Sequence, residues 1–187
     1  MQHSLNEVKM QLENIYTKRL VLIPYTREIA TEILDGRYQL LYYLGISLGT
    51  GWPDAAELET VPKILKNLER VNEPSGFESW MIIVRPEMKI IGSTGFKGVP
   101  NEEGSIDIGY GIISQEQKKG YAIEAVTALA NWALAKNEVN NITARCLLTN
   151  SSSARLLEKM KFIEMSRDEE LIYWKLAKQN PMPVHKN

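Results

Sequence analysis

The sequence predicts a single α/β (α+β) domain built on a mixed, mostly antiparallel central sheet with flanking helices. Its 187 residues are 44% hydrophobic and 24% charged, which suits one compact domain with a sizeable core. Strand-like and helix-like segments alternate along the chain, but residues 79–113 hold consecutive strands joined by short turns. That run predicts antiparallel pairing in the middle of the sheet and argues against a doubly wound parallel sheet.

The chain is expected to divide into three parts. We expect residues 1–16 to be an N-terminal helical extension, residues 17–177 to be the single domain, and residues 178–187 to be a loose tail. The extension would pack on the domain or on another subunit, so it also suggests a homodimer. Its apolar residues share one helical face and are Leu5, Val8, Leu12 and Ile15.

Hydrophobic periodicity and turn residues define the elements of the domain. Pro24 stops the first strand, Thr26 can cap the helix that follows, and Asp54 can cap the next. In that second helix, Pro62 suggests that the first part is a separate turn. The expected order is strand 19–23, helix 27–36, loop 45–53, helix 55–72, strands 79–84, 89–96 and 105–113, helix 120–136, strand 141–149, helix 151–160, and strands 162–166 and 170–177.

Composition excludes several classes of partner. The net charge is -1, so no overall field favours nucleic acid or a membrane surface. No stretch approaches the ~20 apolar residues of a membrane span, and the polar start of the chain lacks the apolar core of a signal peptide. A single cysteine excludes an internal disulfide and fits a reducing cytoplasm.

The scarcity of histidine and cysteine excludes several mechanisms. The only histidines are His3 and His185, both near the ends of the chain, so a Ser-His-Asp or Cys-His set is not expected. No histidine or cysteine cluster has the spacing of metal ligands, so we expect no metal. Cys146 lies in an apolar, strand-like run, which favours a packed core thiol over a nucleophile. The chemistry that remains is positioning with one acid–base step.

One segment looks suited to bind an anion. A strand ends near Ile112, a short polar loop follows, and Gly120 opens a long helix. The first N–H groups of a helix have no partner within it and carry partial positive charge, so a phosphate can accept from them where no bulky side chain intervenes. Gly120 and Ala122 keep that approach open, and Lys118 and Lys119 add cationic charge.

Three motifs together resemble one family. The spacing Gln117-x-x-Gly120-x-Ala122 resembles the pyrophosphate loop of the GCN5-related N-acetyltransferases (GNAT). Upstream, residues 104–111 resemble the fourth strand of that family, and downstream, residues 150–162 resemble its Asn-x-x-Ser…Glu-Lys-x-Gly-Phe helix. The resemblance runs from about Thr17 to Ala177 and is closest to the branch of ribosomal-protein alanine acetyltransferases. It implies the GNAT fold, in which the fourth and fifth strands splay apart and acetyl-CoA lies in the opening.

The resemblance also implies the cofactor contacts. Backbone groups from Tyr110 to Ile112 would hydrogen-bond the pantetheine arm, and Asn150 matches a family asparagine that contacts the same arm. Gly109 and Gly111 would suit a β-bulge where the strands separate. The expected acetyl-CoA residues are Tyr110, Ile112, Gln117, Lys118, Lys119, Gly120, Tyr121, Ala122, Asn150 and Ser153.

The resemblance suggests candidates for proton transfer. The acceptor amine must lose a proton, which a carboxylate can take directly or through a water. Asp107 stands where many relatives carry glutamate and is the first candidate base, while Glu102, Glu103 or a water are alternatives. The tyrosine that many members use as the acid is replaced by Leu157, and Ser153, which matches a serine of the favoured branch, is the candidate acid.

Two further expectations concern the helix end and the acceptor pocket. Lys161 replaces a family glycine at a helix end where φ is expected to be positive. A lysine in that conformation costs about 1 kcal/mol, so we expect a local change in the turn. The acceptor pocket is expected between the first two helices and the late strands. Its aromatic candidates are Tyr42, Tyr43, Trp52, Phe77 and Trp80.

The sequence therefore predicts a cytoplasmic acetyl-CoA-dependent N-acetyltransferase. Its acceptor would be a protein N-terminus or a small-molecule amine, which attacks directly in a ternary complex because no residue is placed as a covalent nucleophile. The alternative is a non-catalytic acyl-CoA-binding sensor or interaction module, which the missing tyrosine and the glutamate-to-aspartate change motivate.

Overall fold

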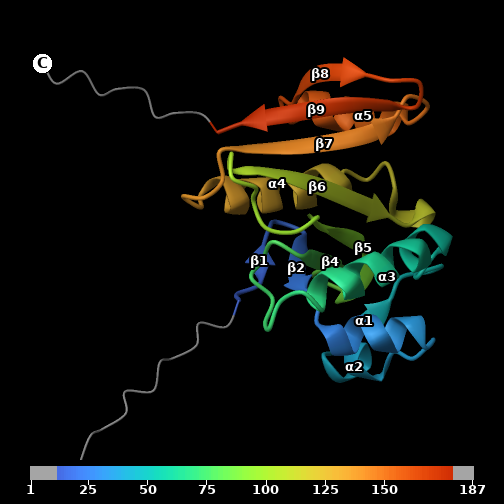
Figure 1. Cartoon of the computed structure of the whole chain (residues 1–187). Helices are drawn as coiled ribbons and strands as arrows, with labels where there is room; N and C mark the ends of the chain where they lie inside the picture. Colours follow the sequence, from blue (N-terminus) through green and yellow to red (C-terminus); the bar gives the residue numbers. More distant parts are fainter. Residues whose placement is uncertain (1–11, 179–187) are drawn as a thin grey trace, which may run out of the picture.

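A single twisted sheet forms the centre of the molecule (Figure 1). The computed structural model describes residues 12–178. Within them the strands run in the order β1-β2-β4-β5-β6-β7-β9-β8, with β3 paired to β5. Their bounds are β1 Ile15–Tyr16, β2 Leu20–Pro24, β3 Ser47–Leu48, β4 Ser79–Val84, β5 Lys89–Phe96, β6 Ser105–Ile112, β7 Asn141–Leu147, β8 Ile163–Arg167 and β9 Leu171–Ala177.

Helices cover both faces of this sheet. The helix α4 packs on β1, β2, β5, β6 and β7, while α1 and α3 pack on one another. Figure 1 shows α3 in front of the sheet and α4 behind it. The bounds are α1 Arg27–Leu34, α2 Gln39–Tyr43, α3 Ala55–Leu68, α4 Tyr121–Leu134 and α5 Ser151–Lys159, with a 3-10 turn η1 at Ser114–Glu116. The mixed, mostly antiparallel architecture that the sequence predicted is confirmed.

The sheet opens between β6 and β7. These two strands pair in parallel only over Ser105–Asp107 and Asn141–Thr143. Beyond that point β6 continues along β5 as far as Ile112 and has no register partner in β7. The predicted splaying of the fourth and fifth core strands is therefore present, and it leaves one edge of β6 exposed to a cleft.

The splaying does not use a β-bulge. The register of β5 and β6 runs without a shift from Gly92↔Ile112 to Phe96↔Ile108. The bulge expected at Gly109 and Gly111 is therefore wrong. The pairing of β6 with β7 ends at Asp107 and Thr143, while β6 keeps regular antiparallel pairing with β5.

The two ends of the domain differ from expectation. Residues 4–11 of the predicted N-terminal helix lie outside the described residues, and its last two residues, Ile15–Tyr16, pair with β2 as a strand instead. Residues 179–187 also lie outside the described residues. Lys178 is not loose, because its ammonium group donates to the carbonyl of Lys136 at 2.8 Å.

Two predicted helix caps are confirmed. The Thr26 hydroxyl accepts from the Ile29 N–H at the start of α1, and the Asp54 carboxylate accepts from the Glu57 N–H at the start of α3. The separate turn expected before Pro62 is wrong, because α3 is continuous from Ala55 to Leu68 and contains the proline. An uninterrupted α3 matters because one face of it forms a wall of the cleft.

Candidate active site

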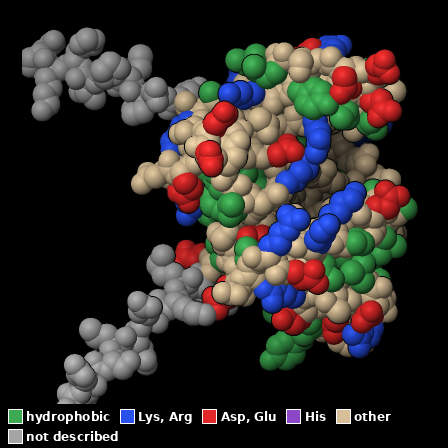
Figure 2. All heavy atoms as spheres, viewed as in Figure 1, with side chains coloured by type: hydrophobic (Ala, Val, Ile, Leu, Met, Phe, Trp, Pro, Cys, Tyr) green, Lys and Arg blue, Asp and Glu red, His purple; other side chains and the backbone are tan. Residues whose placement is uncertain are grey.

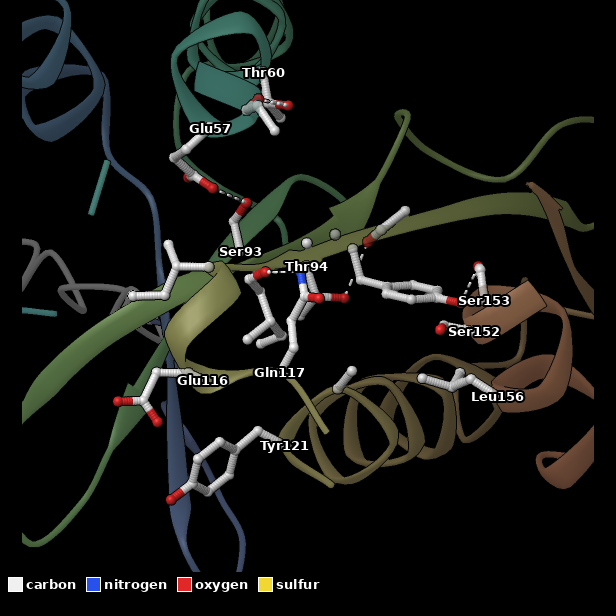
Figure 3. Close-up of a pocket in the computed structure, with 18 of the residues that line it drawn as sticks. Glu57, Thr60, Ser93, Thr94, Glu116, Gln117, Tyr121, Ser152, Ser153 and Leu156 are labelled. Carbon is white, nitrogen blue, oxygen red and sulfur yellow. Dashed lines mark hydrogen bonds between the residues drawn. The ribbon is translucent and has the colours of Figure 1, made fainter. Parts of the chain in front are cut away.

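The opening between β6 and β7 is a cleft of about 910 Å³. Its walls come from α3, the ends of β5 and β6, the turn before α4, and the first turns of α4 and α5. Figure 3 shows side chains from these elements pointing into one space, with Glu57 and Thr60 from α3 on one side and Ser152, Ser153 and Leu156 from α5 on the other. The cleft brings together segments that are far apart in the sequence.

The two faces of β6 supply two sides to this cleft. Ser93 of β5 is the register partner of Gly111 and hydrogen-bonds Glu57 of α3. Successive residues of a strand point to opposite faces, and Tyr110 accordingly reaches α5, where its hydroxyl meets that of Ser153. We call the side of the cleft that holds Glu57 the α3 side, and the side that holds Ser153 the α5 side. A Cβ added to Gly111 would meet no atom within 4 Å, so the strand leaves open space beneath Glu57.

The exposed edge of β6 carries backbone groups without a strand partner. The Lys97 N–H donates to the Asp107 carbonyl, and the Ile113 N–H donates to the Ile91 carbonyl. Because hydrogen-bonded pairs alternate along an antiparallel ladder, the amide and carbonyl of Tyr110 face away from β5, toward the gap left by β7. This edge is available to an extended ligand.

The anion loop has the geometry that the sequence predicted. Gly120 is the N-cap of α4 and has a φ of 81°, in the left-handed region that favours glycine. The first turn of α4 faces the cleft through Gly120, Tyr121 and Ala122, which all line it. Lys118 also lines the cleft, and its own φ is 61°. Open N–H groups at the start of a helix, beside a cation that has no partner among the described residues, are suited to a phosphate.

Arg19 holds this loop from behind. Its guanidinium donates to the Lys119 carbonyl at 2.9 Å and to the Glu124 carboxylate at 2.7 Å, and it stacks over the ring of Tyr121. Burial acts to raise the pKa of the Glu124 carboxyl, but hydrogen bonds from Thr17 and Arg19 outweigh burial, so the pKa is lowered overall. Glu124 therefore stays charged and paired, and the sequence analysis did not identify this brace.

Two predicted cofactor residues have structural partners. The Gln117 amide donates to the Ile112 carbonyl at 2.9 Å and so ties the loop to the end of β6. Lys119 does not line the cleft, and its ammonium pairs with Glu116 at 2.8 Å. The Lys119 ammonium and then that of Lys89 lower the pKa of the Glu116 carboxyl. Of the two lysines expected at the mouth, Lys118 is the one whose ammonium has no partner within residues 12–178.

The α5 side brings two hydroxyl groups together. The hydroxyl oxygens of Tyr110 and Ser153 lie 2.6 Å apart, and burial raises the pKa of the tyrosine. Asn150 caps α5, with its side-chain oxygen accepting the Ser153 N–H at 3.0 Å. All three residues were expected from the sequence, Tyr110 through its backbone alone. The side chain of Tyr110 therefore supplies a phenol where the helix residue Leu157 is buried and apolar.

Asp107 lies outside the cleft. Its carboxylate forms an ion pair with Lys97 and lies 3.8 Å from the guanidinium of Arg145. Asp107 is absent from the residues that line the cleft, whereas Lys97 is among them. Glu102 and Glu103, the alternatives, are exposed in the turn before β6 and do not line it either. None of the three carboxylates is brought together with the Tyr110–Ser153 pair.

A carboxylate that the sequence analysis missed lies on the α3 side. Glu57 is 5% exposed, and its two oxygens accept from the hydroxyls of Tyr25 at 2.8 Å and Ser93 at 2.9 Å. Burial raises the pKa of its carboxyl, while the two hydrogen bonds oppose the rise. Figure 3 shows Glu57 pointing from α3 toward Ser93 at the strand. Its position three residues after Asp54 fits a capping box, a pattern that indicates only a structural role.

The aromatic residues expected around the acceptor pocket do not line the cleft. Trp52, Phe77 and Trp80 are buried in the core, and Tyr42 and Tyr43 are exposed on α2. The side chains that face the cleft from α3 are polar, and they include Thr60, Lys63 and Asn67. Cys146 is a core thiol, as predicted, and accepts from the Trp174 indole.

Within residues 12–178, no group of three or more His, Cys, Asp or Glu side chains could hold a metal ion. The same part of the chain contains no helix that is both long and apolar enough to cross a membrane.

The comparisons with known proteins decide the family. The family model described as "Acetyltransferase (GNAT) domain" matches residues 19–163. The chain belongs to the GNAT acetyltransferase family. It is 37% identical over 137 residues to YjdG, an uncharacterised N-acetyltransferase of Bacillus subtilis strain 168, a match that covers 73% of this chain and 82% of that one. The protein is accordingly an N-acetyltransferase.

Solved structures show the same fold. The ribosomal-protein-S5-alanine acetyltransferase of Vibrio fischeri superposes with a TM-score of 0.66 at 16% identity, covering 90% of this chain and 98% of that chain. The ribosomal L7/L12 alpha-N-protein acetyltransferase RimL, in complex with coenzyme A, superposes with a TM-score of 0.64 at 15% identity, covering 88% and 98%. These GNAT neighbours confirm the predicted fold.

Proposed function

We propose that this N-acetyltransferase moves the acetyl group of acetyl-CoA to a primary amine by direct attack in a ternary complex. The observation that carries the proposal is the cleft, which joins an open helix N-terminus, an unpaired strand edge and a buried carboxylate. A relative of the same fold binds coenzyme A. Acetyl-CoA supplies an activated acyl group and a thiolate leaving group.

The residues of the cleft fit acetyl-CoA. The pyrophosphate would accept from the N–H groups that follow Gly120, with Lys118 nearby. Among the described side chains, neither these N–H groups nor the Lys118 ammonium has a competing partner. The pantetheine arm would pair with the free edge of β6 at Tyr110, as an added strand does. Arg155 and Lys159 on α5 line the α5 side of the cleft and offer further positive charge to the cosubstrate.

Glu57 is the group that we propose to take the proton of the amine. A lysine-like amine has a pKa of about 10.4 and arrives protonated at neutral pH. Glu57 lies over the open space at Gly111, on the face of β6 from which an acceptor can approach. Its raised pKa brings it closer to neutral pH, where a general base is most effective. Asp107 stays a second candidate, which would have to act after breaking its ion pair with Lys97.

The Tyr110–Ser153 pair is our proposed source of a proton for the thiolate. A single serine hydroxyl is a poor acid, but here it shares a hydrogen bond with a phenol on the α5 side. The pair would orient the thioester sulfur and give a proton to the thiolate as it leaves. This assignment keeps Ser153 in the role predicted from the sequence and adds the Tyr110 side chain to it.

The test separates binding from turnover. Calorimetry with acetyl-CoA, and with ATP and NAD as controls, measures whether the cleft is selective for the cosubstrate. Release of free CoA with a panel of primary amines then measures transfer. Saturable acetyl-CoA binding with amine-dependent CoA release is the expected result. Binding without release from any amine would favour the acyl-CoA sensor, and competition by ATP or NAD would contradict the assigned cosubstrate.

A further inference from the structure

The α3 side of the cleft carries cations although the whole chain is slightly acidic. Lys63 of α3 and Lys97, which follows β5, both line the cleft. Lys97 pairs with Asp107, which Arg145 also approaches, whereas the acidic residues Asp54 and Glu57 line the other end of this side, at the start of α3. Lys63 forms no ion pair with any residue that the structure describes. Figure 2 shows Lys and Arg side chains gathered around the hollow of this face.

These two lysines are not placed to serve acetyl-CoA. The expected phosphate site is at the start of α4, and Lys118, Arg155 and Lys159 border the α5 side, which adjoins it. Lys63 belongs to α3, whose residue Glu57 faces the opposite side of β6 through Ser93. The cations on the α3 side therefore act on what enters from that side, namely the acceptor.

Positive charge beside an amine-binding site restricts the acceptor. The ammonium ion of an acceptor can face Glu57 and Asp54, but the part of the same molecule that reaches Lys63 and Lys97 is held only if it carries an anion. A polyamine would bring further positive charge to the two lysines and would be disfavoured. The charges thus disfavour one of the acceptor classes that the sequence left open.

The spacing along α3 indicates how far the anion lies from the amine. Glu57, Thr60, Lys63 and Asn67 all line the cleft and follow one face of the helix. At a rise of about 1.5 Å per residue, Lys63 lies about 9 Å along the axis from Glu57. In an extended peptide, successive residues advance by about 3.3 Å. An anion two to three residues from the amine matches this span, whereas the carboxylate of a free α-amino acid is too close.

We infer that the acceptor is a primary amine with an anionic group two to three peptide units away. Lys63 and Lys97 bind the anionic group, while Glu57 receives the amine. The inference rests on the proposed acetyl transfer. The chemistry can come from an acidic peptide N-terminus or from a small ω-amino acid. The amine and the anion would lie along the polar face of α3, with the amine innermost.

The experiment uses matched pairs of ligands. One pair is an amidated pentapeptide with a free N-terminus and glutamate at its third and fourth positions, and its twin with glutamine there. The other is 6-aminohexanoate and its carboxamide. Binding of each to the full chain, with and without saturating CoA, is measured by calorimetry at low salt and at 1 M NaCl, and CoA release from acetyl-CoA is measured separately.

The expected result is tighter binding of the acidic member of a pair, by about two- to fivefold for each lysine engaged, and loss of the preference at 1 M NaCl, where the screening length is about 3 Å. Lys63→Gln should reduce the preference and Lys63→Glu should reverse it. The matched control is Lys66→Gln, which changes an exposed lysine of the same helix outside the cleft. Preference for the peptide pair alone would assign a peptide acceptor, and preference for the small pair alone a small molecule.

Equal binding of the acidic and neutral members, or a preference unchanged in Lys63→Glu, would overturn the inference. That failure is distinct from failure of the proposed function, which appears as absence of acetyl-CoA binding or of CoA release. Ligand binding is measured without turnover, so it tests the inference whether or not the protein transfers an acetyl group.

Discussion

The hydroxyl oxygens of Tyr110 and Ser153 lie 2.6 Å apart, and they join β6 to α5 across the opening of the sheet. Each residue is placed by its own element. Strand alternation turns Tyr110 toward α5, and the Asn150 cap fixes the first turn of that helix. A phenol from a strand thereby reaches the first turn of α5, whereas Leu157, at the position where many relatives carry a tyrosine, is buried and does not line the cleft.

Removal of either hydroxyl should slow the proposed transfer. We expect Tyr110→Phe and Ser153→Ala each to lower kcat by about tenfold to hundredfold, at or below the range for a general acid, with little change in the affinity for acetyl-CoA. Because the two groups act together, the double variant should lose less than the product of the single losses. Steady-state CoA release and calorimetry provide both numbers. Full additivity would show that the two hydroxyls do not act as a pair.

Replacement of Glu57 should remove the dependence of the rate on a base. Glu57→Gln keeps the shape of the side chain but cannot accept a proton, so kcat should fall by about a hundredfold or more at neutral pH. The wild-type rate should rise with pH through the raised pKa of this carboxyl, and the variant should lack that step. The matched comparison is Asp107→Asn. A larger loss in Asp107→Asn than in Glu57→Gln would transfer the role of the base to Asp107.

A carboxylate at the loop should abolish binding of acetyl-CoA. Gly120→Glu adds negative charge near the start of α4 and forces a side chain into a left-handed conformation, and its Cβ would lie 3.3 Å from the Arg19 guanidinium, so the change also disturbs the brace behind the loop. Gly120→Ala is the control, because it carries the backbone strain of about 1 kcal/mol without the charge. We expect calorimetry to show no binding for Gly120→Glu and weakened binding for Gly120→Ala. Wild-type affinity in both would contradict the anion loop.

The sequence predicts local structure well where a residue type has one physical use. Gly120 at the helix start, Asp54 as a cap and the paired hairpin strands are of this kind, because positive φ, capping and alternation depend on neighbours in the chain. The role of Glu57 could not be predicted in this way. Its partners Tyr25 and Ser93 come from other elements, and only the packing of α3 on the sheet brings them to it. The ion pair that Asp107 forms likewise depends on a neighbour from the adjoining strand segment, Lys97.

Lys161 offers a stabilising substitution outside the cleft. The sequence predicts a positive φ here, and the residue adopts 67°, while the Phe162 N–H closes the end of α5 by donating to the Leu157 carbonyl. The lysine therefore keeps the turn of the family glycine, and the turn change that we expected is wrong. Lys161→Gly should raise the free energy of unfolding by about 1 kcal/mol, with unchanged CoA release. A denaturant titration measures the gain, and an equal or lower stability would show that the lysine is not strained.

The buried carboxyl of Glu57 should make the protein less stable as the pH rises. Burial raises its folded pKa above the unfolded value, so the folded state holds this proton more tightly. The stability that it contributes is complete below the unfolded pKa and is lost as the pH rises through the folded pKa. The Tm of Glu57→Gln, which is never ionised, should therefore rise relative to that of the wild type as the pH is raised from 4 to 8. A scan of Tm against pH for both proteins measures this, with Glu59→Gln, an exposed change on the same helix, as the control. A Tm difference between Glu57→Gln and the wild type that stays constant with pH would mean that Glu57 is not destabilised by ionisation, and would remove the physical basis for its raised pKa.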